Sequence, residues 1–142
     1  EFSYRSEYCA TDGLVLVGDA FSFLDPVFST GVYLALRSGE LAADTIHQTF
    51  QDGEKFTAEK FADYGRNFRD TVETMRKIVY AFYDENFSFG KLIRKDMALR
   101  GPLTDCLIGN VDEQDFSKLF QTMSEFANLP EPVDYGDILR TA

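Results

Sequence analysis

Three short groups of residues near the start of the chain could bind a ligand together. They are Gly18–Ala20, Asp25–Pro26 and Ser29–Gly31. The carboxylate of Asp19 can accept hydrogen bonds from sugar-like hydroxyl groups. Backbone N–H groups at the start of a helix favour anionic oxygen, and a glycine there lets a flat or anionic group come close. These groups predict a site for a ligand that carries a polyol and an electron-rich ring edge.

The elements expected around these groups are a strand, a turn and a helix. Residues 14–17 form a continuous apolar run, so we expect a central strand that is buried on both faces. Asp19 would follow the carboxyl end of this strand, where ligands bind in open α/β sheets. Pro26 forces a turn, and Ser29 or Thr30 is expected to cap the next helix. The apolar stripe that this helix is expected to bury consists of Val32, Leu36, Ala43, Ile46 and Phe50.

Most of the remaining chain has a helical pattern. Alternation over residues 2–8 predicts another strand, which either pairs with residues 14–17 as a hairpin or joins a larger sheet. The predicted helices cover residues 57–85, 91–99 (stopped by Gly101–Pro102) and 112–128, with a weakly ordered helical tail over 135–142. The core stripe of the longest helix is Phe61, Tyr64, Phe68, Val72, Met75, Val79 and Phe82. The predicted fold class is α+β and mainly helical, with two N-terminal strands followed by a helical C-terminal region.

The groups described first resemble a known cofactor signature. Gly18–Ala20, Asp25–Pro26 and Ser29–Val32 are similar to the second FAD signature of flavoprotein monooxygenase-like enzymes, and residues 18–32 together resemble the flavin-dependent halogenases more closely. The resemblance is specific over about residues 2–50 and loose beyond them. It implies that Asp19 contacts the ribityl chain and that the backbone around Thr30–Gly31 helps to bind chloride. The full set of implied cofactor-binding residues is Gly18, Asp19, Pro26, Ser29, Thr30, Gly31 and Val32.

The resemblance also implies a chemistry, in which FADH2, O₂ and chloride act on an aromatic substrate. Tryptophan halogenases carry Glu where this chain has Phe28. Phe at this place resembles the subgroup that acts on phenol or pyrrole rings, which are often bound to a carrier protein. The family's Gly-x-Gly-x-x-Gly motif, its Trp-x-Trp-x-Ile-Pro segment and its catalytic Lys are absent from the sequence. No catalytic or metal-binding residue is therefore assigned in this chain.

These absences lead to the expectation of a C-terminal fragment that is inactive alone and does not retain FAD. Residues 1–50 would be the end of an FAD-binding domain, and residues 51–142 a helical C-terminal region. Two alternatives stay open: another FAD-dependent dehydrogenase, reductase or hydroxylase of the same superfamily, or a non-enzymatic helical module that binds a partner. An apolar face left exposed by a missing sheet would favour dimerisation.

The charge and the cysteine and histidine content of the chain limit which partners and which chemistry we expect. The net charge of −10 opposes binding to nucleic acid or to an anionic membrane surface. The two cysteines, Cys9 and Cys106, have no metal-binding spacing and favour a reducing, cytoplasmic location. His47, the one histidine, has no partner placed for a catalytic triad. A local basic cluster is either a solvated helix face or a docking patch for an acidic carrier protein; it comprises Lys91, Arg94, Lys95 and Arg100.

Overall fold

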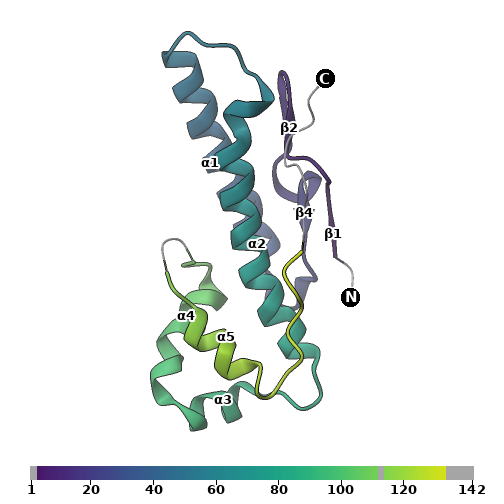
Figure 1. Cartoon of the computed structure of the whole chain (residues 1–142), viewed down its shortest axis with the longest axis vertical. Coiled ribbons are helices and arrows are strands. Elements are labelled where there is room, and N and C mark those ends of the chain that lie inside the picture. The colour runs from purple at the N-terminus through teal and green to yellow at the C-terminus, as the bar shows by residue number, and fades with distance from the viewer. Residues whose placement is uncertain (1–2, 112–113, 134–142) are drawn as a thin grey trace. The chain divides into compact units, whose positions relative to one another are not determined.

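The computed structural model describes residues 3–111 and 114–133. These residues form helices and two small antiparallel sheets, which confirms the mainly helical α+β class (Figure 1). The helices are α1 Gly31–Gln51, α2 Ala62–Tyr83, α3 Phe89–Lys95, α4 Arg100–Ile108 and α5 Ser117–Met123. The strands are β1 Tyr4–Arg5, β2 Ala10–Thr11, β3 Leu14–Val15 and β4 Ser22–Phe23. None of the helices in this part of the chain is long and apolar enough to cross a lipid bilayer.

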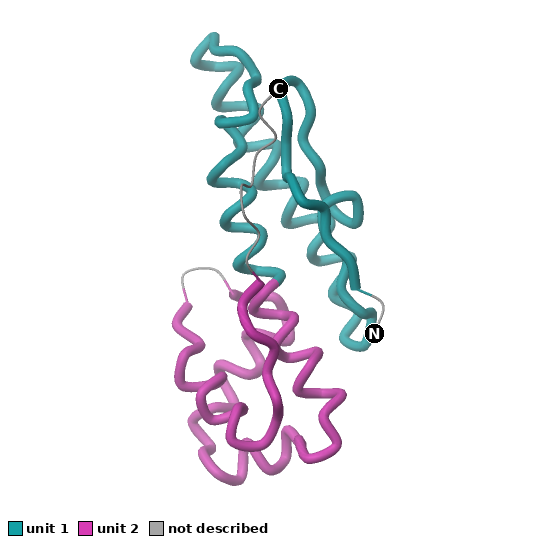
Figure 2. The backbone as a smooth tube through the Cα atoms, turned by 45° about the vertical axis from the view of Figure 1, so that its right-hand side comes forward, with its two compact units in different colours: residues 1–72, 134–142 teal, residues 73–133 magenta. Residues whose placement is uncertain are grey.

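The chain divides into two compact units, which are described one at a time (Figure 2). The division falls within α2, between Val72 and Glu73. The first unit contains all four strands, α1 and the first half of α2, whereas the second contains the rest of α2 and α3–α5. The predicted end of an FAD-binding domain at residue 50 stays a prediction, because these units report packing within this chain alone.

The strands of the first unit pair differently from the expectation. β2 and β3 form a hairpin around Asp12 and Gly13, and Gly13 adopts a φ of +74° that suits glycine. β1 pairs with β4 instead of with residues 14–17. The prediction of a strand buried on both faces is wrong for this chain, because Leu14 is 51% exposed and Val17 39% exposed. Among the described strands β3 pairs with β2 alone, and this small sheet leaves Leu14 and Val17 exposed.

The aromatic core of the first unit lies on α2 and confirms the predicted stripe there. Phe61, Tyr64, Phe68 and Val72 are all buried. The ring of Phe21, which follows the strand-end segment, lies 5.6 Å from the ring of Phe68 and 6.0 Å from that of Tyr64. The first half of α2 therefore supports the segment that carries the candidate ligand-binding residues.

The buried face of α1 is not the predicted one. Val32, Leu36 and Phe50 are each more than 70% exposed. The side chains that α1 buries are instead Leu34, Ser38, Ala42 and Thr49. This face is composed mainly of small residues, which allow the segment Gly18–Ala20 to pack closely against the helix. The close packing of Gly18–Ala20 on these side chains, together with the hydrogen bond from Gly18 to Ser38, determines which face of α1 is buried within this chain.

The second unit buries one face of each of its helices. Met75 and Val79 of α2 are buried as predicted, whereas Phe82, at the end of the stripe, is 46% exposed. Its other buried apolar side chains include Ile78, Leu92, Leu99, Leu103, Cys106, Phe116, Leu119 and Met123. The predicted stop at Gly101–Pro102 is wrong, because α4 begins at Arg100 and a proline is tolerated in the first turn of a helix.

The remaining helix boundaries also differ. The predicted helix over 91–99 is α3, which begins earlier, at Phe89, and ends at Lys95, followed by a short 3₁₀ turn, η4 (Met97–Leu99). Asp96 accepts a hydrogen bond from the N–H of Ala98 and so caps this turn. α5 ends at Met123, before the predicted boundary at Asn128. The predicted start at Asp112 and the tail over 135–142 lie outside the described residues.

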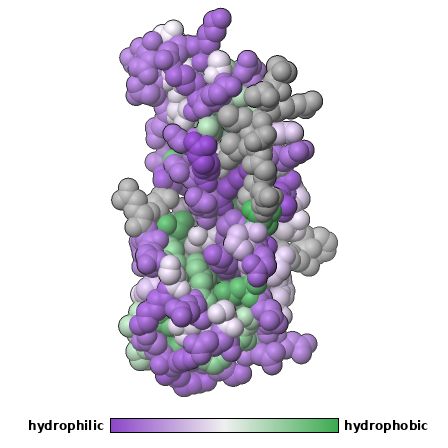
Figure 3. Space-filling model, in the orientation of Figure 1, coloured by the Kyte–Doolittle hydropathy of each residue, from purple (hydrophilic) through white to green (hydrophobic). Residues whose placement is uncertain are grey.

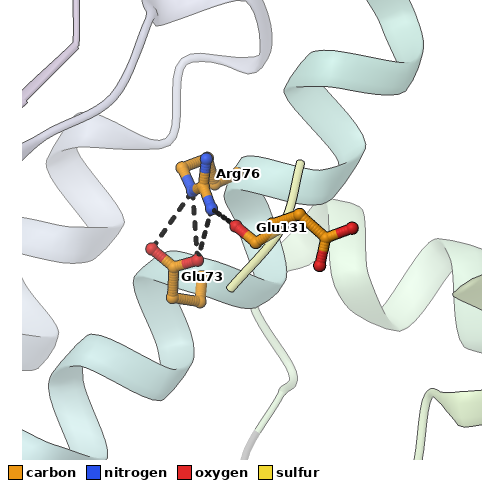
Figure 4. Close-up of polar contacts among 3 residues, drawn as sticks. All are labelled: Glu73, Arg76 and Glu131. Carbon is orange, nitrogen blue, oxygen red and sulfur yellow. Dashed lines mark hydrogen bonds and ion pairs between the residues drawn. The ribbon is translucent and has the colours of Figure 1, made fainter. Parts of the chain in front are cut away.

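Within the second unit, an arginine on α2 connects this helix to the segment that follows α5 (Figure 4). The guanidinium of Arg76 donates to both carboxylate oxygens of Glu73, at 2.7 to 3.1 Å. The same group donates to the backbone carbonyl of Glu131 at 2.6 Å and lies over the ring of Tyr80. The side chains of Arg76 and Glu73 are only 13% and 15% exposed, so water screens this pair weakly.

Replacement of Arg76 by alanine is expected to lower the free energy of unfolding by about 2 kcal/mol, because the mostly buried carboxylate of Glu73 and the carbonyl of Glu131 would both lose the hydrogen bonds that Arg76 donates. Arg66→Ala is the matched control, since Arg66 forms an i,i+3 pair with Asp63 on the same helix but is 60% exposed. That pair should contribute less than about 0.5 kcal/mol. Urea denaturation measures both variants, and equal losses would contradict the assigned role of Arg76.

Candidate functional site

The segment Gly18–Ala20 forms a short 3₁₀ turn, η1, fixed against α1 by a buried polar contact. The N–H of Gly18 donates to the hydroxyl of Ser38 at 2.7 Å, and that hydroxyl donates to the carbonyl of Ala35 at 3.0 Å. Gly18 has a φ of +54°, and a Cβ there would lie 3.4 Å from the Cβ of Ala35. The backbone conformation and the close packing therefore both favour glycine at this position.

Asp19, the next residue, is the middle residue of η1 and is exposed. Its carboxylate has no ion pair or hydrogen bond within the part of the chain that the structure describes. The sequence predicted that Asp19 directly follows a strand, but it lies within the 3₁₀ turn η1, which begins after β3 has ended. A carboxylate held on a fixed turn, without an internal partner, is available to accept hydrogen bonds from a ligand.

The loop between β4 and α1 is shaped by Asp25 and Pro26. The carboxylate of Asp25 is buried and accepts a hydrogen bond from the N–H of Val27 at 3.2 Å, so it caps the 3₁₀ turn η2 (Pro26–Phe28). Pro26 is exposed at the first position of this turn. Ser29 ends the turn in the left-handed region with a φ of +55°, which is uncommon for a residue other than glycine.

Thr30 lies at the N-cap position of α1, but its side chain does not cap the helix. Only 7% of Thr30 is exposed, and its Oγ1 is buried without a hydrogen-bond partner among the described residues. The prediction that the side chain of Ser29 or Thr30 caps α1 is therefore wrong: Thr30 occupies the N-cap position, but no side chain makes the capping hydrogen bond. An unpaired buried hydroxyl costs about 1–3 kcal/mol, so this atom is a candidate for contact with a group from outside the described chain.

The first turn of α1 is open around this hydroxyl. A Cβ added at Gly31 would meet nothing within 4 Å, and Val32 is 72% exposed. The N–H groups of a helix's first turn have no acceptor within the helix. Gly31 and Val32 can therefore present backbone donors beside Thr30, in a region where the helix dipole favours negative charge.

The structure places all seven predicted site residues in the first unit. Pro26 and residues 29–32 are contiguous with the start of α1, whereas Gly18 and Asp19 lie on η1, which contacts α1 at Ala35 and Ser38. The site therefore has two parts, connected by α1 itself.

Two residues that position the site were missed in the sequence. The hydroxyl of Ser38 accepts the hydrogen bond from the N–H of Gly18, and this role was not predicted. The signal in the sequence was that Ser38 lies one turn before Ala42 on the same face of α1, where small side chains allow a close contact. Tyr64 was predicted as core only, but its hydroxyl donates to the carbonyl of Leu16 at 2.6 Å, just before η1. Burial raises the pKa of the Tyr64 hydroxyl, so it remains a donor throughout the neutral range.

The single histidine, one aromatic pair and the two cysteines were also considered as functional groups. His47 is exposed on α1. Phe87 and Phe89, at the start of α3, contact each other edge to face with ring centres 5.1 Å apart, and this contact stabilises the loop before that helix. Cys9 and Cys106 are buried free thiols.

An exposed carboxylate after a strand and an open helix start are features of cofactor-binding sites in α/β proteins. Sequence comparison identifies the family: residues 4–106 match the tryptophan halogenase family. The chain belongs to this family. The resemblance to flavin-dependent halogenases inferred from residues 18–32 is thereby confirmed.

Individual relatives agree with this assignment. The chain is 29% identical over 111 residues to a 1H-pyrrole-2-carbonyl-[peptidyl-carrier protein] chlorinase of Pseudomonas fluorescens, covering 78% of this chain and 24% of the relative. It is 36% identical over 86 residues to a tryptophan 2-halogenase of Chondromyces crocatus, covering 61% of the chain and 16% of the relative. A flavin-dependent halogenase of Acremonium egyptiacum is 38% identical over 69 residues, or 44% of the chain and 12% of the relative. The chain thus spans a quarter or less of the length of these relatives.

Proposed function

We propose that this chain supplies one side of the FAD site in a flavin-dependent halogenase that acts on an aromatic ring held by a carrier protein. The observation that carries the proposal is the buried hydroxyl of Thr30, unpartnered among the described residues at the open start of α1. Membership of the halogenase family supports the identity of the cofactor. A relative that acts on a carrier-bound pyrrole supports the substrate class.

The residues present fit a flavin. The carboxylate of Asp19 would accept hydrogen bonds from the ribityl hydroxyls, while the Thr30 hydroxyl and the N–H groups of Gly31 and Val32 would donate to the polar edge of the ring. Gly18 and Pro26 would fix the two loops that carry these groups. The reduced cofactor, when bound, supplies the electrons for the reaction with O₂ that allows chloride to be oxidised.

The proposed role of this chain is to bind and orient the cofactor and the chloride ion. The N–H groups at the start of α1 lie where the helix dipole favours an anion, so the Thr30–Gly31 backbone is also the proposed contact for chloride. Phe28 is half-buried and offers an apolar ring instead of a carboxylate, which disfavours a substrate with a free ammonium group such as tryptophan. We assign the proton transfers and the halogenating step to residues outside these 142.

A chimera tests the flavin site. Residues 4–106 of this chain would replace the matching segment of the P. fluorescens chlorinase, and FAD retained after gel filtration would be measured by visible absorbance. We expect the chimera to retain FAD and Asp19→Ala to weaken FAD binding by about tenfold or more, because it removes charge-assisted hydrogen bonds. Asp44→Ala, which removes an exposed carboxylate on α1, is the control.

Two results would count against the proposal. Retention of FAD by Asp19→Ala equal to that of the Asp44→Ala control would remove Asp19 from the site. Products that do not change when chloride is added or withheld would favour a hydroxylase or dehydrogenase chemistry instead of halogenation.

A further inference from the structure

The segment from α3 to the start of α4 has a charge opposite to that of the whole chain. Residues 86–104 contain four basic side chains and one acidic side chain, Asp96, in a protein of net charge −10. The carboxylate of Asp96 is itself paired with the ammonium group of Lys118 at 2.6 Å. The next acidic side chain, Asp105 on α4, is half-buried and accepts a hydrogen bond from Asn110, so an acidic partner would meet more positive than negative charge over this segment.

The four cations differ in how much they are already engaged. Lys91 donates to the carbonyl of Asn86 at 3.0 Å, and Lys95 forms an ion pair with Glu125. Arg94 and Arg100 are exposed and form no ion pair with any other residue that the structure describes. These two guanidinium groups remain available for carboxylates of a partner, which they can bind in a bidentate manner.

Exposed apolar side chains accompany the two arginines. Met97, 65% exposed, lies in η4 between Arg94 and Arg100, and Ile108, 67% exposed, lies at the end of α4. On the face of the molecule seen in Figure 3, hydrophobic residues also come to the surface over the helices of the second unit. Cations combined with exposed methionine and isoleucine are suited to an amphipathic acidic helix.

The backbone beneath these side chains is well supported. Leu92, Leu99 and Leu103 anchor α3, η4 and α4 respectively, and each is at most 6% exposed. A surface built on packed elements can hold its charged groups in place before a partner arrives, which lowers the entropy lost on binding.

We propose that Arg94, Met97, Arg100 and Ile108 form the docking surface for an acidic carrier protein that presents the aromatic substrate. This inference rests on the proposed function for the nature of the partner, but the charge and exposure of the surface are independent of the flavin site. Carboxylates on a helix of the carrier pair with Arg94 and Arg100, and apolar side chains of the same helix cover Met97 and Ile108. Nucleic acid is the other polyanion to consider, and the net charge of −10 disfavours it.

The test measures binding without any catalytic readout. The probe is the pyrrole-2-carbonyl-loaded peptidyl-carrier protein on which the P. fluorescens chlorinase acts, titrated against the 142-residue chain by isothermal calorimetry at low salt. Arg94→Glu combined with Arg100→Glu is expected to raise Kd by about tenfold or more. The combination of Arg94→Ala with Arg100→Ala, a milder change, is expected to raise Kd by about threefold.

A matched pair controls for the change in total charge. Lys60→Glu with Arg66→Glu alters the net charge by the same amount in the first unit and should raise Kd less than about twofold. Circular dichroism would check that each variant is folded. The proposal is overturned if the carrier does not bind, if both glutamate pairs weaken binding equally, or if a short DNA duplex binds as tightly as the carrier.

Failure of this inference and failure of the proposed function give different results. Carrier binding that persists in a protein whose chimera loses FAD would refute the flavin site alone. Retention of FAD together with carrier binding that is insensitive to Arg94 and Arg100 would refute the docking surface alone.

Discussion

Replacement of Phe68 by alanine is expected to lower the free energy of unfolding by about 4 kcal/mol. Phe68 is 0% exposed and lies between two other rings, stacked on Tyr64 at 6.2 Å and tilted against Phe21 at 5.6 Å. Truncation would remove both aromatic contacts and leave a cavity that the helix cannot close. Urea denaturation followed by circular dichroism would measure the loss.

Phe50→Ala is the matched control for this prediction, because Phe50 is 72% exposed on α1. It should change the free energy of unfolding by less than about 0.5 kcal/mol. Phe68→Leu should fall between the two, since leucine refills part of the cavity. If Phe50→Ala were as damaging as Phe68→Ala, the exposed orientation of the α1 stripe would be wrong.

The loss at Phe68 also concerns the candidate site. Phe21 follows η1 directly, and its N–H donates to the carbonyl of Gly18 at 2.9 Å. Tyr64 holds the carbonyl of Leu16 on the other side of the same turn. A looser aromatic cluster would therefore release the turn that carries Asp19, so Phe68→Ala should weaken FAD binding by the chimera even where the chimera stays folded.

The difference between α2 and α1 explains how much of the fold could be predicted. On α2 the most apolar face is also the buried face, so hydrophobic periodicity was sufficient for Phe61 to Val79. On α1 the most apolar face is exposed, and the buried face carries Ser38 and Ala42. Periodicity ranks faces by hydrophobicity and cannot detect that Gly18 needs both a close approach and the acceptor on Ser38.

The same limit applies to the candidate site. The resemblance of Gly18–Ala20 and Ser29–Val32 to a flavin signature identified the family. The positive φ of Gly18 and Ser29 shows that the backbone conformation constrains part of this signature. The failure of Thr30 to cap α1 could not be predicted, since residue type alone favours the cap. Whether the seven site residues bind FAD stays a prediction until the chimera is measured.

The second large effect is a loss of stability at alkaline pH that depends on Cys106. Burial, and then the neighbouring charge of Asp105, raise the pKa of the Cys106 thiol from its ordinary value of 9.0 to about 12. Above pH 9 the unfolded chain releases this proton while the folded chain retains it, so the unfolded state is favoured as the pH rises. The loss from this thiol should reach about 2 kcal/mol near pH 10.5 and continue until the folded thiol ionises.

Cys106→Ala isolates this contribution, because Cys9 and Tyr64, whose pKa values are also raised, remain in both proteins. The free energy of unfolding of the unsubstituted chain should fall more steeply between about pH 9.5 and 10.5, by about 1 kcal/mol per pH unit relative to the variant. The comparison uses slopes, so the cavity left by the smaller side chain, which is independent of pH, cancels. Parallel slopes would mean that the Cys106 thiol is reached by water in the folded state, and α4 could then not pack as the structure shows.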